Sequence, residues 1–248
     1  MKVTLLSHTP EPEKLIASAA KLCYSNKADI DSLMNDLTPE KVNSFIEHLE
    51  SLGHSSPFEN ASFTFGIEGV SRALLAQYSR SRIGVSLAVR SQRYCAEDNF
   101  EYVIPESISL KERTLAVYKN AMDNAKDAYK TLIENGVPKE DARMVLPNAT
   151  CTRFITTLNV RSLIYLSRLR MCQRAQSEIR EMVFKMIEEA RKVAPLLFKH
   201  AGPPCVMGYC PEGSMSCGRV PTLNEVMKAY NNEEWYEYRN ENKNKEVH

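Results

Sequence analysis

Arginine is concentrated between Gln77 and Tyr94, where eighteen residues contain four arginines and no lysine. Hydroxyl and amide side chains accompany the arginines along the segment. A guanidinium group binds a phosphate through two parallel hydrogen bonds, whereas an ammonium group acts as a point charge. The segment therefore indicates a phosphate-binding site. From composition alone, the alternative is a solvated or salt-bridged face.

A second set of arginines follows in the C-terminal half. Arg170 and Arg174 are four residues apart, so on one helix they would share a face and place two cations one turn apart. Arg174 and Glu178 have the same spacing, and an ordinary ion pair along the helix is the alternative for any one of these arginines. The set comprises Arg143, Arg153, Arg161, Arg168, Arg170 and Arg174.

Other residue types give weaker signals of chemistry. His54 falls in an expected loop, where a single histidine is more often structural than catalytic, and no Ser-His-Asp or Cys-His arrangement can be recognised from spacing. Cys205, Cys210 and Cys217 have a Cys-x4-Cys-x6-Cys spacing, which differs from the Cys-x2-Cys pairs of common zinc sites. We therefore expect loop cysteines and no metal site.

Composition excludes several classes of protein. The chain has 32 basic and 31 acidic residues, so no global field favours nucleic acid or an anionic membrane. There is no long apolar run and no signal-peptide pattern at the N-terminus. The seven scattered cysteines do not form a disulfide framework. These features predict a cytoplasmic protein that binds neither membrane nor nucleic acid.

The elements that must position these residues mix strands and helices without a β-α-β repeat, which predicts an α+β fold. The expected sheet is mixed or antiparallel and packs against long helices. Expected strands cover residues 3–6, 61–67 and 154–158; expected helices cover 12–22, 39–52, 71–78, 110–135 and 138–146, and one long helix follows residue 158 with Leu169 on its buried side. One domain is expected over residues 1–219. A polar tail follows at 220–248, in which Trp235 and Tyr236 could contact a partner.

Six groups of residues form motifs in a fixed order along residues 1–219. They are Gly53-His54-x-Ser56-Pro57-x-Glu59; Ala61-Ser62-Phe63-Thr64-Phe65; Arg80-x-Arg82 with Ser91-x-Arg93-Tyr94; Ala142-Arg143-x-Val145-Leu146-Pro147; Asn159-x-Arg161; and Leu169-Arg170-x3-Arg174-Ala175-Gln176-x-Glu178-Ile179-Arg180. In order and spacing the chain resembles the flavin-dependent thymidylate synthases. Each motif is modest alone, but six in register make chance agreement implausible.

The resemblance implies a homotetramer whose active sites form at subunit interfaces and bind FAD and dUMP. This family methylates C5 of dUMP with methylenetetrahydrofolate as carbon donor and NADPH as reductant, without a cysteine nucleophile. Carried over by position, the dUMP-binding residues would be Gln77, Arg80, Ser91, Arg93, Arg143 and Arg170, with Arg170 catalytic. The FAD-binding residues would be His54, Ser56, Arg80, Ser81, Arg82, Val89, Asn159, Arg161, Tyr165 and Arg174.

The chain departs from the family pattern mainly on the flavin side. Ser81 replaces the histidine of Arg-His-Arg, and eight residues instead of seven separate Arg82 from Ser91. Val89, Tyr165 and Arg174 stand where the family commonly has polar or histidine side chains. Two alternatives to thymidylate synthesis therefore stay open. One is a paralogue running another flavin or one-carbon reaction on a pyrimidine nucleotide, and the other is a non-catalytic nucleotide- or RNA-binding homologue.

Overall fold

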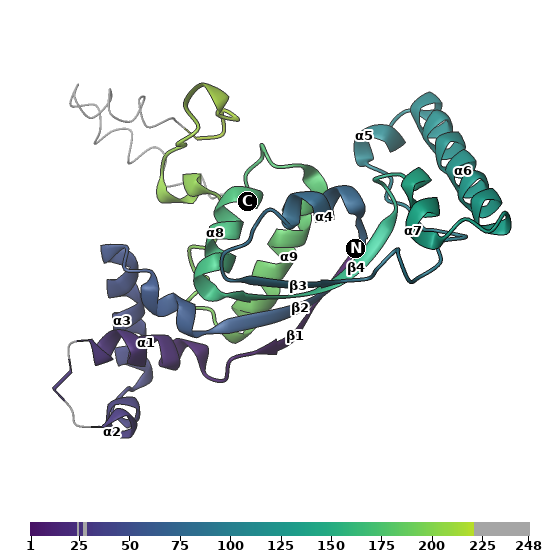
Figure 1. The fold of residues 1–248 in the computed structure, drawn as a ribbon. Helices are drawn as coiled ribbons and strands as arrows, with labels where there is room; N and C mark the ends of the chain where they lie inside the picture. The colour runs from purple at the N-terminus through teal and green to yellow at the C-terminus, as the bar shows by residue number, and fades with distance from the viewer. Residues whose placement is uncertain (24, 27–28, 221–248) are drawn as a thin grey trace.

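The computed structural model describes residues 1–23, 25–26 and 29–220. Its centre is an antiparallel sheet of four strands in the order β1-β2-β4-β3 (Figure 1). The strands are β1 (Lys2–His8), β2 (Ser62–Ser71), β4 (Cys151–Asn159) and β3 (Val85–Val89). The predicted α+β class is confirmed. The predicted contacts of Trp235 and Tyr236 lie outside the described residues.

One face of the sheet carries the core. Phe63, Phe65 and Ile67 alternate along β2 and are fully buried, as the period of two predicts. The helices α4 (Arg72–Tyr78), α8 (Val160–Arg170) and α9 (Ser177–Val193) lie over this face (Figure 1). The opposite face is polar or exposed. There Thr64 and Thr157 pair through their hydroxyl groups at 2.9 Å, and Ile155 is half exposed.

Helices at one end of the sheet begin and end where local signals predict. They are α1 (Pro12–Leu22), α2 (Ile30–Asn35) and α3 (Pro39–Leu52), followed by the 3-10 turn η1 (Ser56–Asn60). The Thr38 hydroxyl accepts a hydrogen bond from the Lys41 amide at the start of α3. Gly53 ends this helix with a φ of 68°, a conformation that glycine adopts without strain. Of these three helices, the sequence pattern missed the short α2.

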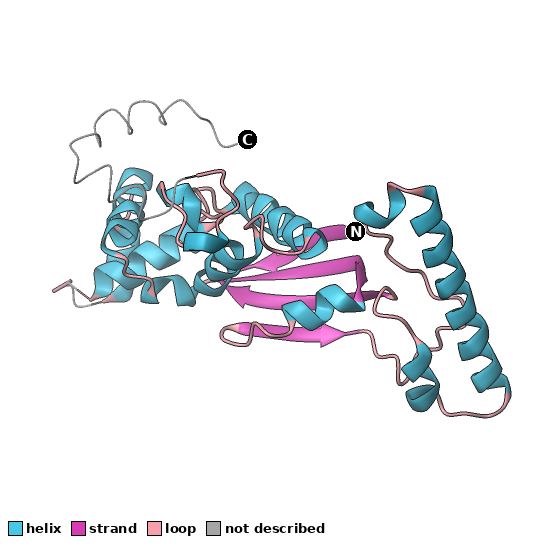
Figure 2. Ribbon diagram, turned by 90° about the horizontal axis from the view of Figure 1, so that it is seen from above, coloured by secondary structure: helices cyan, strands magenta, loops and turns pink. Residues whose placement is uncertain are grey.

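An arm extends from the other end of the sheet (Figures 1 and 2). It consists of α5 (Glu106–Ser109), α6 (Glu112–Glu134), α7 (Lys139–Ala142) and the turn η2 (Arg143–Val145). The helix α6 is solvated along most of its length, and Met122 and Tyr129 are its buried residues. The predicted exposed amphipathic helix is confirmed. No described helix has the length and apolar character needed to cross a bilayer.

The predicted long helix after residue 158 is wrong, because the chain forms two helices there. The helix α8 ends at Arg170, and α9 begins at Ser177. Gln176 caps the start of α9, because its side chain accepts a hydrogen bond from the Ile179 amide. Leu169, predicted to be buried, is 46% exposed. The break contains neither glycine nor proline, so no local stop signal marked it.

The strand β3 was not predicted, although Val85, Leu87 and Val89 alternate with small residues. Its five residues pair only with β4, so it forms an edge of the sheet. Beyond α9 the chain forms a lobe of turns that includes η3 (Pro204–Met207) and η4 (Gly213–Met215). The glycine- and proline-rich sequence of this lobe predicted such turns.

Candidate active site

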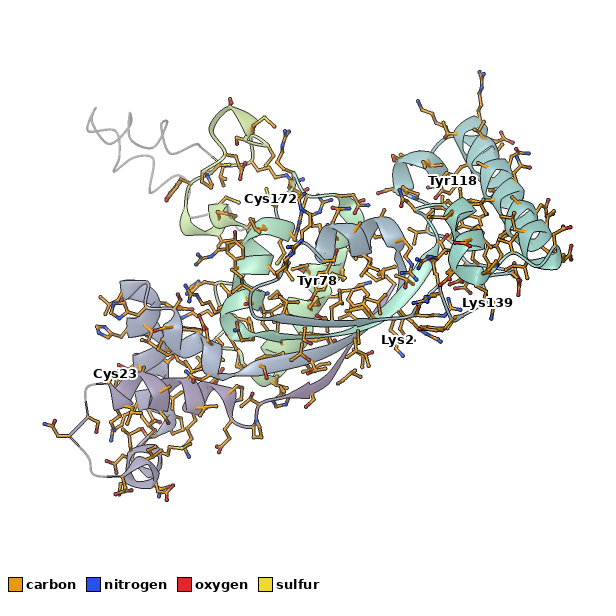
Figure 3. The ribbon with its side chains drawn as sticks, viewed as in Figure 1. Lys2, Cys23, Tyr78, Tyr118, Lys139 and Cys172 are labelled. Atoms are coloured by element: carbon orange, nitrogen blue, oxygen red, sulfur yellow. The ribbon has the colours of Figure 1, made fainter. Side chains whose placement is uncertain are left out.

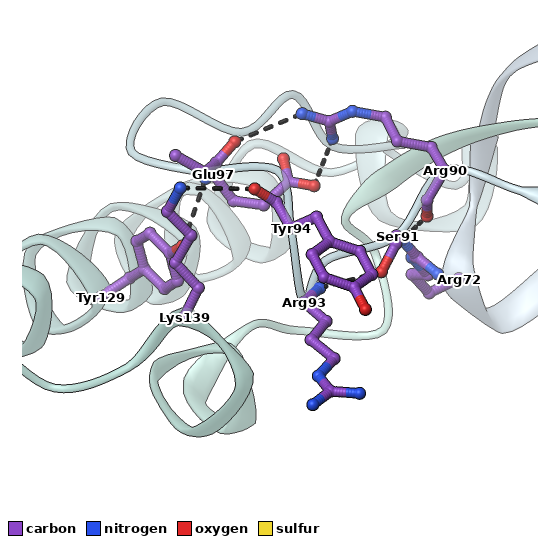
Figure 4. Close-up of polar contacts among 9 residues, drawn as sticks. Arg72, Arg90, Ser91, Arg93, Tyr94, Glu97, Tyr129 and Lys139 are labelled. Atoms are coloured by element: carbon purple, nitrogen blue, oxygen red, sulfur yellow. Dashed lines mark hydrogen bonds and ion pairs between the residues drawn. The ribbon is translucent and has the colours of Figure 1, made fainter.

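The segment of residues 90–97, called here the 90–97 loop, leads from β3 toward the arm and carries two predicted site residues (Figure 4). The Ser91 hydroxyl accepts a hydrogen bond from the Arg93 amide at 3.2 Å. The Arg93 guanidinium is exposed, lies 5.6 Å from the centre of the Tyr94 ring and forms an ion pair with Glu140. The Arg93 guanidinium therefore lies at the surface, paired with the carboxylate of Glu140.

Arg143 lies next to the same carboxylate residue. Its Nε donates to the main-chain oxygen of Glu140 at 3.0 Å, and its side chain is exposed. The fold therefore brings Ser91, Arg93 and Arg143 together around Glu140, although Arg93 and Arg143 are fifty residues apart. Sequence reasoning missed Glu140, because a glutamate at the start of a short helix gives no signal of which arginine it will meet.

Gln77 and Arg170 form a second group. Arg170 Nη2 donates to the Gln77 main-chain oxygen at 3.2 Å, and Arg170 Nε is buried with no hydrogen-bond partner among the described residues. The Gln77 amide donates to the Gln176 side chain at 3.4 Å. The protein thus holds one edge of the guanidinium, at Nη2.

Tyr78 anchors the helix that carries Gln77 (Figure 3). It is fully buried, stacks on Phe154 with ring centres 5.3 Å apart and exchanges a 2.7 Å hydrogen bond with the Thr156 hydroxyl. Burial raises the pKa of Tyr78, so the phenol stays protonated and acts as a structural group. This anchor sets where α4 ends and where the following arginines leave it.

A third group forms where the loop after α4 meets the N-terminus of α8. The Asn159 side chain caps α8, and the Asn159 amide donates to the Gly84 oxygen at 3.2 Å. Gly84 has a φ of 65°, and a Cβ there would lie 2.6 Å from Asn159 Nδ2. The Ser162 hydroxyl also donates to the Ile83 oxygen at 2.8 Å. The loop is thereby fixed against the helix start.

Arg80 and Arg82 project from this fixed loop. Both are exposed, and within residues 1–23, 25–26 and 29–220 neither guanidinium has a hydrogen-bond or ion-pair partner. Ser81 between them is half-buried. Two unpaired cations near the N-terminus of a helix suit an anionic group, because the helix start also presents free amide donors.

The predicted flavin residues before β2 reach the same region through Arg161. Arg161, in the first turn of α8, forms an ion pair with Glu59 of η1. Ser56 begins η1 and is exposed, and His54 is exposed directly after Gly53. The fold thus brings the segment of His54 and Ser56 next to the start of α8.

Three of the residues predicted to bind flavin lie outside the groups described above. Val89 pairs with Phe154 in the sheet and packs against the core, so it offers no polar group. Tyr165 is 61% exposed on α8. Arg174 lies beyond the end of α8, where its Nη2 is 3.6 Å from Met215 Sδ in the lobe of turns.

The predicted pairing of Arg174 is wrong in both forms. Arg174 does not share a helical face with Arg170, because the helix ends at Arg170. Glu178 does not lie one turn from Arg174 on a helix either, and its carboxylate accepts from the Ser71 amide at 2.7 Å and the Ser71 hydroxyl at 2.6 Å. Glu178 therefore ties α9 to the start of α4.

Two partly buried cysteines have thiols that are less acidic than usual, with raised pKa values. Burial raises the pKa of Cys151, and nearby carboxylates act in the same direction, so its thiol is kept protonated. Burial also raises the pKa of Cys205, and the neighbouring thiols of Cys172, Cys210 and Cys217 add to this effect. Among the described residues, no three cysteine, histidine or acidic side chains are arranged to hold a metal ion.

The three groups of site residues are separate within one chain. Arg161 and Arg170 are nine residues apart on α8, which corresponds to about 13 Å along the axis. Lys139, beside the 90–97 loop, and Cys172, just after Arg170, lie in different parts of the molecule (Figure 3). A cavity of about 690 Å³ between the sheet and the arm is lined by residues such as Lys126, Cys151 and Glu178, and none of the predicted site residues lines it.

Comparison with known proteins shows similarity to one enzyme family over most of the chain. The family model described as thymidylate synthase complementing protein matches residues 4–196. A flavin-dependent thymidylate synthase of Geobacter sulfurreducens is 46% identical over 230 residues, covering 92% of this chain and 98% of the relative. One from Clostridium tetani is also 46% identical, over 91% and 96% of the two chains, and one from Nitratidesulfovibrio vulgaris is 42% identical over 89% and 95%.

Proposed function

The chain belongs to the flavin-dependent thymidylate synthase family, and from this premise we propose how its residues divide the work of that reaction. The reaction transfers a methylene group from methylenetetrahydrofolate to C5 of dUMP and reduces it to the methyl group of dTMP, with NADPH as reductant. Bound FAD supplies the hydride for this reduction. We assign the activity to residues 1–219.

Arg170 is the residue that activates dUMP in this proposal. Its Nη2 is held by the Gln77 oxygen, and its buried Nε has no partner among the described residues. A cation held beside N3 and the carbonyl group of the pyrimidine stabilises the negative charge that makes C5 nucleophilic. The observation that carries the proposal is the guanidinium already positioned by the Gln77 oxygen, since a group held in place needs little reorganisation when charge develops.

The remaining dUMP-binding residues would come from two of the groups. Ser91, Arg93 and Arg143 provide two guanidinium groups and a hydroxyl, which suit a phosphate. Gln77 and Arg80 would complete the binding of the nucleotide beside Arg170. For these contacts the nucleotide must displace the Glu140 carboxylate from Arg93, and the exposure of both side chains makes this exchange inexpensive.

The residues around the start of α8 fit a flavin dinucleotide. Arg80 and Arg82 are unpaired cations among the described residues, and Asn159, Arg161, Ser56 and His54 add polar groups from neighbouring segments. The unpaired arginines would bind the pyrophosphate, for which their charge and fork geometry are suited. Tyr165, Ser81 and Arg174 would contribute hydroxyl and guanidinium groups, and Val89 would contribute only apolar contact.

We propose that two or more subunits of a homotetramer complete each site. The groups lie apart on one chain, so a second copy can bring the Arg93 group of one subunit to the Arg170 group of another. Large apolar side chains near these groups are exposed, including Ile83 at 91%, Tyr94 at 73% and Met144 at 81%. Exposed apolar surface of this kind supports association. The reducing cytosol suits the seven free thiols.

The test separates the two ligand sites. Purified protein should show a flavin absorption band with FAD and form dTMP from dUMP, methylenetetrahydrofolate and NADPH. Arg82→Ala should lower FAD content, whereas Arg93→Ala with Arg143→Ala should raise the KM for dUMP and leave the flavin band unchanged. A protein that binds flavin and dUMP but forms no dTMP would point to another reaction on the same nucleotide.

A further inference from the structure

The 90–97 loop is closed by its own first side chain. The Arg90 guanidinium forms an ion pair with the Glu97 carboxylate and donates to the Ala96 oxygen at 3.2 Å (Figure 4). Arg72 Nη2 of α4 donates to the main-chain oxygen of Arg90 at 2.8 Å. Both ends of the loop are thus fastened, and Ser91 and Arg93 lie between them.

The arm fastens the same loop from its other side. The Glu97 amide donates to the Tyr129 hydroxyl of α6 at 3.3 Å, and Tyr129 is fully buried. The Lys139 ammonium of α7 donates to the Tyr94 oxygen at 3.3 Å (Figure 4). The position of the loop therefore depends on contacts with α4 and with two helices of the arm, α6 and α7.

The ion pair within the loop is unusually buried for this protein. The Arg90 and Glu97 side chains are 25% and 6% exposed, and in the part of the chain that the structure describes no other ion pair has both partners below 30%. Removing one partner of a buried pair leaves the other charge uncompensated. Removing either partner should therefore disturb the loop more than removing one partner of a surface pair.

Arg72 also lies within electrostatic range of the Glu97 carboxylate. Burial lowers the pKa of Arg72, and the Glu97 carboxylate opposes that shift while Arg90 and Arg143 add to it. Three arginines therefore lie close enough to interact electrostatically, with Glu97 as the nearby anion. Without Glu97, the repulsion among Arg72, Arg90 and Arg143 would lack this compensating charge.

We propose that Arg72, Arg90 and Glu97 are positioning residues for dUMP: they hold the 90–97 loop so that Ser91 and Arg93 meet the nucleotide together with Arg143. The inference rests on the proposed function, in which Ser91, Arg93 and Arg143 bind dUMP. None of the three positioning residues needs to touch the substrate. Their effect is on the affinity for dUMP, and the flavin region at the start of α8 is separate.

The experiment measures dUMP binding to the FAD-loaded protein by calorimetry, together with flavin content and melting temperature. Glu97→Gln keeps the shape of the side chain and removes its charge, so the Kd for dUMP should rise about tenfold, equivalent to about 1.4 kcal/mol. Tyr129→Phe keeps the core volume and removes one anchor, so it should raise the Kd to a smaller extent even if Glu97→Gln folds poorly. Flavin content should match the wild type in both variants.

The matched control is Glu134→Gln, which breaks an exposed ion pair with Lys130 on the same arm and should leave the Kd unchanged. Arg93→Ala distinguishes a failure of the positioning role from a failure of the proposed dUMP site. If Arg93→Ala weakens dUMP binding but Glu97→Gln and Tyr129→Phe do not, the positioning role is refuted and the site assignment stands. If Arg93→Ala binds dUMP normally, both the assignment of the dUMP site and the positioning role are refuted. A parallel loss of flavin and dUMP in Glu97→Gln and Tyr129→Phe would show general destabilisation and also refute positioning.

Discussion

Replacing Arg170 with alanine should abolish most turnover while leaving the fold intact. Arg170 is half-buried at the end of α8, and its guanidinium donates a hydrogen bond to the Gln77 oxygen. Its buried Nε has no partner among the described residues, and the bond to Gln77 holds the guanidinium in place. We therefore expect the loss to fall on catalysis more than on folding.

The two losses can be estimated separately. Removing one preorganised donor that stabilises developing charge lowers kcat by about 10²–10³, or about 2.7–4 kcal/mol. Losing one hydrogen bond that involves a charged donor costs about 1.5–3 kcal/mol of stability. For a chain of this size each kcal/mol shifts the melting temperature by about 2–4 °C. Arg170→Ala should thus melt several degrees lower and still bind FAD.

The assay is dTMP formation at saturating dUMP, with flavin absorbance and thermal melting on the same preparation. Arg170→Lys keeps the charge but loses the fork, so its kcat should fall between those of the wild type and Arg170→Ala. Arg168→Ala, on the exposed side of the same helix, is the matched control and should retain activity. If folded, flavin-bound Arg170→Ala kept kcat within about tenfold of the wild type, Arg170 would not be the activating residue.

Three further results are expected. Glu140→Gln removes the carboxylate that competes with the nucleotide for Arg93. Because this ion pair is exposed, the KM for dUMP should fall by no more than about fivefold. An unchanged KM in steady-state assays would mean that Arg93 does not bind the nucleotide. Gly84→Ala places a Cβ 2.6 Å from Asn159 Nδ2 at a φ of 65°, so the melting temperature and the FAD content should fall together. Wild-type values of both would show that the loop shifts away and would contradict this expectation. Burial raises the pKa of Glu13, so its protonated form is favoured in the folded state, and the stability of the wild type relative to Glu13→Gln should fall as the pH rises from about 4 to about 7. Urea unfolding of both proteins at the two pH values checks this, and a constant difference would contradict it.

Local signals in the sequence determined much of the fold. The alternation of Phe63, Phe65 and Ile67 predicted β2, and Thr38 and Gly53 predicted both ends of α3. These predictions succeeded because each depends on residues within one strand or one turn of helix. The break between α8 and α9 was missed, since it depends on Gln176 capping the second helix and on the docking of Glu178 onto Ser71.

The sequence by itself also determined which chemistry to expect. The arginines, the absence of an activated nucleophile and six motifs in register identify the family, because residue types and spacing are properties of the chain alone. Only the tertiary structure decided which side chains meet. Arg93 meets Glu140, Arg90 meets Glu97, and Arg170 meets the main chain of Gln77. Contacts between distant segments leave no periodic trace in the sequence, since they are set by how the helices dock on the sheet.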